Sequence, residues 1–75
     1  MWKFVMAGRE ADCVLEGKRI FDHAWVATGE KVVLPDPIYN EKHTLTVYEV
    51  TFGERVIIFA AGEFSNSVWG IFVRE

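Results

Sequence analysis

The segment TLTVYEVTF-GE-RVIIFAA, residues 44–61, decides the fold. Two runs rich in Val, Ile, Thr, Tyr and Phe flank the pair Gly53-Glu54, and such branched or planar side chains suit the pleated surface of a β-sheet. A glycine in a two-residue connection is typical of a tight hairpin turn. The segment therefore predicts a β-hairpin with arms 44–52 and 55–61.

The first arm changes the face on which its apolar side chains lie. Leu45 and Val47 occupy odd positions, whereas the apolar residues that follow occupy even positions: Tyr48, Val50 and Phe52. Because side chains alternate strictly between the two faces of a strand, a flat strand cannot bury both sets on one side. We expect a β-bulge, or a strand that bends from one packed layer into another. The second arm is apolar at every position of 56–61, which predicts a central strand covered on both faces.

Shorter β-favouring runs extend the pattern on both sides of this hairpin. They predict a strand over 2–6, a hairpin over 13–21 with the type II′ turn Gly17-Lys18, a hairpin over 24–34 with the turn 28–30, and a last strand over 68–73. A short helix over 9–16 is the alternative to the first arm of the earliest hairpin, since Ala, Glu and Leu favour helices. Gly70, inside the last strand, predicts a bend or a close backbone approach.

Seventy-five residues without an internal boundary predict a single domain, 1–75. Strands joined mostly by hairpins predict an all-β fold: a small antiparallel, partly open barrel or a two-layer sandwich of about six to seven short strands. The segment 9–16 is its only alternative helix.

Charge and composition exclude several classes of partner. The formal net charge is -3, and the eleven acidic and eight basic residues are spread along the chain, so nucleic-acid binding is not expected. No run approaches the roughly 18 apolar residues of a transmembrane helix, so no membrane contact is expected. A single cysteine rules out an intramolecular disulfide framework, which favours a cytoplasmic protein.

The sequence carries no recognisable catalytic or metal motif. Cys13, His23 and His43 are the only thiol and imidazole groups, and a lone cysteine in an apolar run is usually a small buried side chain. No C-x-x-C or H-x-x-x-H pair occurs, and the glycines form no phosphate-binding loop. We therefore predict no catalytic residue, no metal and no cofactor.

One acidic residue stands in an unusual context. Glu49 lies inside the apolar first arm, where an edge position facing water is the favoured expectation and a partly buried carboxylate with a raised pKa is the alternative. Glu63, before Phe64, is a weaker candidate of the same kind.

The chain has more large aromatic residues than so small a core must contain: three Trp, six Phe and two Tyr. Trp2, Tyr39, Phe64 and Trp69 each lie at a terminus, in a predicted loop or beside one, which makes them candidate anchors for protein contacts. Simple core packing is the alternative.

These features favour a noncatalytic interaction module of the adaptor or inhibitor type, which binds another protein or forms a homodimer. Its size and lack of motifs are also typical of short proteins encoded by phages and mobile elements. The alternative function is a small β-barrel that binds a small-molecule ligand or single-stranded nucleic acid.

Overall fold

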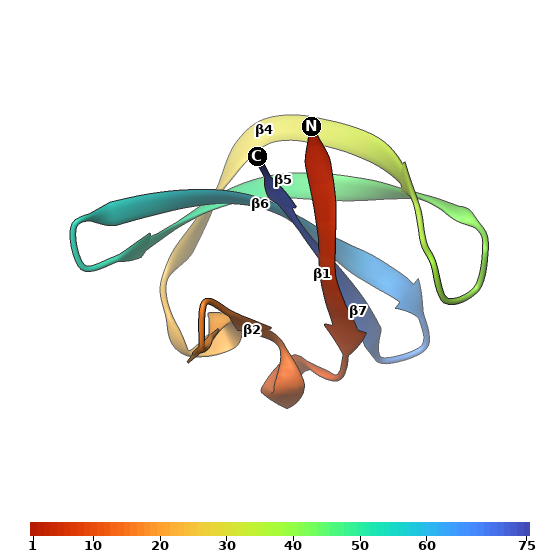
Figure 1. Cartoon of the computed structure of the whole chain (residues 1–75), viewed down its shortest axis with the longest axis horizontal. Helices are drawn as coiled ribbons and strands as arrows, with labels where there is room; N and C mark the ends of the chain where they lie inside the picture. The colour runs from red at the N-terminus through yellow and green to blue at the C-terminus, as the bar shows by residue number, and fades with distance from the viewer.

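A computed structural model describes all 75 residues and is built almost entirely of β-strands (Figure 1). The strands are β1 (Trp2–Gly8), β2 (Val14–Leu15), β3 (Lys18–Arg19), β4 (Trp25–Pro35), β5 (Lys42–Phe52), β6 (Arg55–Ser65) and β7 (Val68–Arg74), with 3₁₀ turns η1 (Glu10–Asp12) and η2 (Ile20–Asp22). Five strands form one antiparallel sheet in the order β1-β7-β6-β5-β4, and β2 and β3 form a separate hairpin. The predicted all-β class is confirmed, and the edge strands β1 and β4 leave the sheet open rather than closed into a barrel. No helix that could span a membrane is present.

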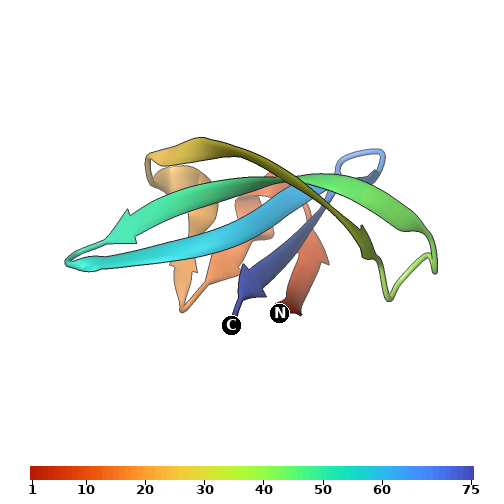
Figure 2. The same cartoon turned by 90° about the horizontal axis from the view of Figure 1, so that it is seen from above.

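The predicted hairpin over 44–61 is confirmed as β5 and β6. Pairing runs without irregularity from Thr46 opposite Ala61 to Phe52 opposite Arg55, and Gly53 has φ of 64° in the turn. Figure 2 shows this hairpin projecting beyond the rest of the sheet. β6 is the middle strand of the five, as expected from its continuous apolar run.

The change of apolar phase in β5 divides the interior into two clusters on opposite faces of the sheet. Leu45 and Val47 belong to one buried cluster, whereas Val50 and Phe52 belong to the other. β5 itself is regular against β6, and the bulge lies in the neighbouring strand β4, between Ala27 and Lys31 and thus opposite Val47. The predicted strand that serves two layers is therefore confirmed, with the bulge in its partner.

The predicted hairpin over 24–34 is wrong, because its two arms form the single strand β4. Both arms pair with β5, and the predicted turn 28–30 is the bulge between them. Gly29 has φ of 90°, and the Thr28 hydroxyl donates to the carbonyl of Val47 at 3.2 Å and accepts the Glu30 amide at 3.2 Å. Glycine geometry suits a bulge as well as a turn, and the long β5 offers both arms a partner.

Residues 9–23 form a cap over one face of the sheet. The predicted hairpin is present as β2 and β3, but its turn is Glu16-Gly17, with φ of 53° and 78°, which corresponds to a type I′ rather than a type II′ turn. The alternative helix over 9–16 is absent apart from the single 3₁₀ turn η1. No backbone–backbone hydrogen bond joins the cap to the sheet.

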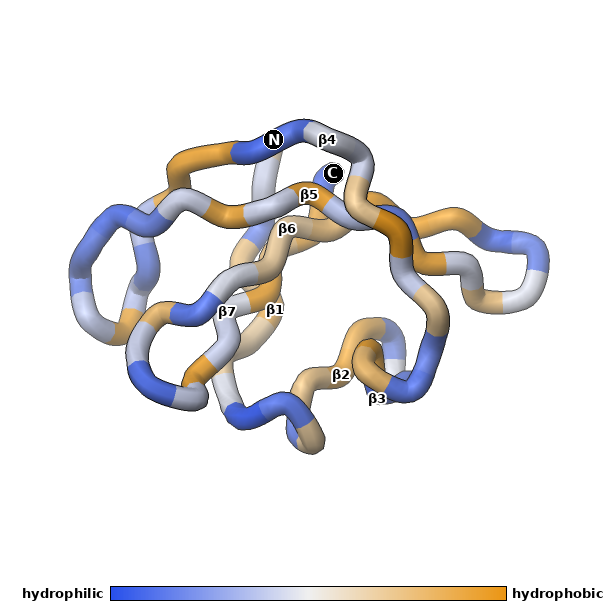
Figure 3. The backbone as a smooth tube through the Cα atoms, turned by 180° about the vertical axis from the view of Figure 1, so that it is seen from behind, coloured by the Kyte–Doolittle hydropathy of each residue, from blue (hydrophilic) through white to orange (hydrophobic).

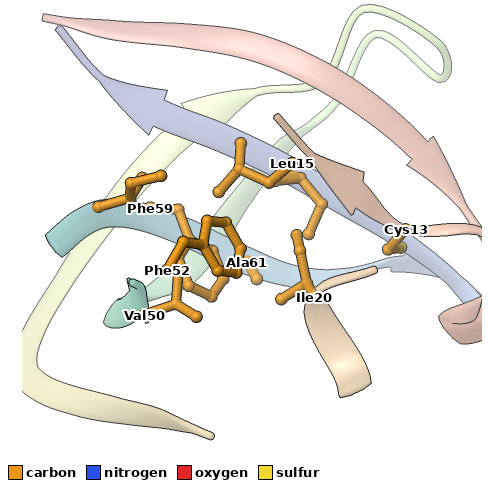
Figure 4. Packing of buried hydrophobic residues seen from close by; sticks show 9 residues of the cluster. Cys13, Leu15, Ile20, Val50, Phe52, Phe59 and Ala61 are labelled. Carbon is orange, nitrogen blue, oxygen red and sulfur yellow. The ribbon is translucent and has the colours of Figure 1, made fainter. Parts of the chain in front are cut away.

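Side chains hold the cap in place (Figure 4). Cys13, Leu15 and Ile20 point from the cap toward the sheet and are buried. We call their group the cap-side cluster, which consists of Cys13, Leu15, Ile20, Val50, Phe52, Ile57, Phe59, Ala61 and Ile71. At the rim, the Arg55 guanidinium donates to both carboxylate oxygens of Glu16, at 2.5 and 3.0 Å. The cap thus covers the face that the second half of β5 buries.

The opposite face is buried by the curl of the sheet itself. This curl-side cluster consists of Leu45, Val47, Ala60, Phe64 and Phe72. Trp2 and Phe4 from one edge strand, and Val32 and Leu34 from the other, pack against it. The Arg74 guanidinium lies 4.8 Å from the Trp2 ring and donates at 2.9 Å to both carboxylate oxygens of Glu30. These contacts link the edges across the curl.

Gly70 is closely approached, but by a side chain rather than by the backbone segment that the sequence predicts. The Phe64 ring lies directly against Gly70, and a Cβ atom there would collide with several ring atoms. Gly62, the cross-strand partner of Gly70, lies against Leu45, and an added Cβ would stand 2.6 Å from Leu45 Cδ2. The two glycines therefore make room for the curl-side cluster.

Both edge strands carry features that disfavour further strand pairing. β1 has an irregularity between Phe4 and Met6, and β4 has its bulge, Lys31 and the terminal Pro35. Bulges, lysine and proline are the usual means by which open edges avoid adding strands. A partner is thus expected to contact side chains rather than the sheet edges.

Replacing Gly70 by alanine should destabilise the fold by about 1–3 kcal/mol, because the new methyl group displaces the buried Phe64 ring. Urea denaturation followed by tryptophan fluorescence measures the change. Gly8→Ala is the matched control, since its nearest contact is the flexible end of Met6 at 3.3 Å. Equal stability of the two variants would contradict the packing role of Gly70.

Candidate functional site

The four predicted aromatic anchors do not form one surface. Trp2 is partly buried beneath Arg74 on the curl side. Tyr39 is 45% exposed on the loop between β4 and β5, where the Ser65 hydroxyl donates to its hydroxyl at 3.2 Å. Trp69 is partly exposed on the cap side, in β7. They therefore mark three separate places.

The expectation that Phe64 is exposed in a loop is wrong. β6 continues to Ser65, so Phe64 is a strand residue, and it is only 5% exposed. Its ring stacks on the imidazole of His43, with centroids 4.9 Å apart, and packs near Phe4 and Phe72. Phe64 is a core residue because Gly70 leaves space for its ring.

Glu49 is exposed, so the favoured expectation that its carboxylate faces water is confirmed, although β5 is an inner strand of the sheet rather than an edge strand, and the alternative of a buried carboxylate is wrong. Its register partners are Val26 on β4 and Ile58 on β6, at the outer end of the curl side. Val26 is itself 68% exposed, so no layer covers this corner. Glu63, the weaker candidate, is also exposed, but it lies in a different setting.

Trp69 and Glu63 lie in the larger of two surface hollows, a groove of about 660 Å³. We call it the end groove, and its lining residues are Arg9, Glu10, Ala11, Glu63, Asn66, Ser67, Val68 and Trp69. One wall is the chain that follows β1, and the other is the β6–β7 hairpin. In Figure 3 the chain that follows β1 lies near the β6–β7 hairpin, and both segments include hydrophilic residues. The groove thus brings a predicted anchor together with charged side chains.

Local structure fixes the indole of Trp69. The residue pairs with Gly8 on one side and with Glu63 on the other. The Phe21 ring meets the indole edge to face, with centroids 5.5 Å apart and planes at 68°. A large aromatic side chain held by neighbours loses little conformational freedom when it binds a partner.

Two carboxylates and one guanidinium give the end groove a net negative charge. Glu10 comes from η1, Glu63 from β6 and Arg9 from the chain between β1 and η1. None of these three side chains takes part in an ion pair, the ion pairs of the fold being Arg19–Asp22, Asp36–His43, Glu16–Arg55 and Glu30–Arg74. The Ser67 amide donates to the Glu63 carboxylate at 3.4 Å. The carboxylates therefore remain available to a ligand.

Sequence reasoning missed the one buried carboxylate, Asp36. Its side chain is fully buried at the start of the β4–β5 loop, where it accepts hydrogen bonds from the backbone amides of Ile38, Tyr39 and Asn40. The other carboxylate oxygen lies 2.5 Å from Nε2 of His43. The sequence did contain a signal for this role, since Asp36 stands between two prolines. An aspartate side chain in a turn commonly accepts a hydrogen bond from the backbone amide two residues later.

The contact between Asp36 and His43 stabilises the β4–β5 loop and does not form a binding or catalytic site. Burial by itself would raise the pKa of Asp36, but hydrogen bonds from the Tyr39 amide, the His43 ring and the Ile38 amide outweigh it and lower the pKa below its ordinary value. All bonds of the carboxylate are internal to the loop and to β5. The pair therefore stabilises the ends of β4 and β5.

Replacing Asp36 by asparagine should lower stability at neutral pH and remove part of the acid sensitivity of the protein. A carboxylate whose pKa is depressed in the folded state stabilises the fold above its unfolded pKa of about 3.9, and this contribution is lost as pH falls through the folded value. Urea denaturation from pH 7 down to pH 2 should show the two proteins converging in acid. A constant difference across the range would show that Asp36 acts without its charge.

The contacts of Cys13 and His23 indicate that these two residues have structural roles. Burial, together with the charges of Asp12 and Glu10, raises the pKa of the Cys13 thiol, which donates to the carbonyl of Arg9 at 3.3 Å. The His23 ring packs against Phe52, with centroids 4.9 Å apart. Neither arrangement activates a nucleophile.

Comparison of the chain with protein-family models, curated proteins and solved structures finds no match. The end groove is thus identified by its geometry and chemistry alone.

Proposed function

We propose that the protein is a noncatalytic interaction module of the adaptor or inhibitor type that binds another polypeptide through the end groove. The supporting observation is the partly exposed indole of Trp69, which packs against the Phe21 ring and lies beside charged side chains that form no ion pair. Aromatic side chains of this kind commonly supply much of the energy of a protein interface. The buried, unactivated thiol of Cys13 suits the reducing cytoplasm, which we take as its compartment.

The edge strands favour this groove over strand addition as the place of contact. Each edge is interrupted, β1 near Val5 and β4 at 28–30. A homodimer built through sheet edges would have to align these irregularities, whereas the end groove offers side chains directly. Self-association, if it occurs, is therefore also expected to use the groove.

A small-molecule ligand is the second candidate, because about 660 Å³ lies within the range of ligand sites, roughly 300–1,000 Å³. Its lining is mostly polar and its outer residues are exposed, which suits a ligand less well than a polypeptide segment. Inside the curl, the rings of Phe4, Phe64 and Phe72 fill the space that a barrel would offer. The net negative groove also opposes nucleic-acid phosphates.

Site-specific photocrosslinking tests the interaction proposal. A benzophenone amino acid at exposed Ala11, in the groove wall, should give an adduct of higher mass in a lysate of the cells from which the gene derives. The same residue at Val56, which is 57% exposed and outside the groove, is the matched control. The Ala11 adduct should decrease when Trp69→Leu removes the indole but keeps an apolar side chain.

Purified protein crosslinked alone separates self-association from binding to another chain, since only a homodimer gives twice the mass. Adducts from neither position, or equal adducts from both, would contradict binding through the end groove. A shift of tryptophan emission by metabolite pools, without any adduct, would favour the small-molecule function.

A further inference from the structure

We propose that the end groove recognises a basic side chain, an arginine in an extended segment of the partner polypeptide. This inference rests on the proposed function and names the chemistry of the bound group. It is carried by the juxtaposition of the Trp69 indole with the carboxylates of Glu63 and Glu10.

The indole and the Glu63 carboxylate form one composite surface. Glu63 and Trp69 are direct register partners on β6 and β7, and side chains of such partners lie next to each other on one face of the sheet. A cation over an indole is attracted by the ring, and arginine makes this contact more often than lysine. Its planar guanidinium can stack on the ring while it donates hydrogen bonds to a carboxylate in its own plane.

The second carboxylate comes from the opposite wall of the end groove. Glu10 lies on η1, and with Glu63 it outnumbers the single positive charge of Arg9. Asp12 lies two residues beyond Glu10 and is also exposed, so it adds a third carboxylate near the groove. The formal charge of the side chains that line the groove is therefore negative. Arg9 is positively charged and would repel a bound guanidinium, which must therefore bind away from it.

The shape of the groove favours a side chain that reaches in from a segment lying outside it. Ala11, Asn66 and Ser67 line it and are exposed to solvent. The Ser67 amide holds the Glu63 carboxylate at 3.4 Å and so limits its freedom before binding. An acidic segment would meet two unpaired carboxylates and is disfavoured.

Three synthetic peptides test the inference: acetyl-Gly-Ser-Arg-Ser-Gly-amide and the same sequence with citrulline or glutamate in place of arginine. Citrulline keeps the shape of arginine and removes its charge. Each is titrated to millimolar concentration into ¹⁵N-labelled protein, and the Trp69 indole N–H and the amides of 9–11 and 66–68 are followed by NMR. We expect the arginine peptide to shift these signals and the citrulline peptide to bind several-fold more weakly.

Charge-neutral variants identify the carboxylates. Glu63→Gln and Glu10→Gln should each weaken the arginine peptide about two- to fivefold, the range of exposed ion pairs. Glu54→Gln, at the exposed turn between β5 and β6, is the matched control and should leave the affinity unchanged. The dispersion of the NMR spectrum reports whether each variant remains folded.

The inference is overturned if the arginine peptide shifts no groove signal, if citrulline binds equally well, or if only the glutamate peptide binds. If any of these results is obtained while the Ala11 crosslink still forms, the proposal of arginine recognition is contradicted. The proposal that the end groove binds a polypeptide is then retained. If the arginine peptide binds in the groove but no crosslink forms from Ala11, the interaction-module proposal is contradicted. The proposal that the groove binds a cationic side chain is then retained.

Discussion

The change of buried face along β5 is the constraint on which the structure depends. Leu45 and Val47 are buried on one side of the sheet, and Val50 and Phe52 on the other. A single sheet of five strands must therefore have both faces covered, and the chain is too short to supply a second complete layer. The cap covers one face, and the curl of the sheet closes over the other.

The remaining features follow from this division. The bulge of β4 lies opposite Val47, where the buried face changes, and it brings Glu30 to Arg74 across the curl. Gly62 and Gly70 clear space for the side chains that fill the curl. The end groove lies where the chain leaves β1 to form the cap, beside the hairpin that joins β6 and β7. Its position is thus a product of the topology.

Local sequence was sufficient for the β5–β6 hairpin and for the two-layer role of β5. It was insufficient at 28–30, because a glycine with positive φ serves a bulge and a turn equally well, and the choice depended on the distant strand β5. The sequence marked Trp69 as a candidate anchor, whereas it marked Glu63 only as a weak candidate for a buried carboxylate, and the structure leaves Glu63 exposed. Sequence reasoning misplaced Phe64, because the burial of this side chain depends on the space above Gly70.

The cap has a further consequence for the dynamics of the molecule. It is joined to the sheet by side-chain packing, the Glu16–Arg55 ion pair and two weak sulfur contacts, in which the Cys13 thiol donates to the Gly8 carbonyl and the Val14 amide donates to Met6 Sδ. The backbone–backbone hydrogen bonds of the cap all lie within it. Residues 9–23 can therefore open as one unit while the ladder of five strands stays intact. Regions held in this way open at a lower free energy than global unfolding. Amide protons in β2 and β3 would then exchange with solvent through a sub-global opening that transiently uncovers Phe52 and Phe59. The domain would thus unfold in two cooperative units, the cap and the five-stranded sheet.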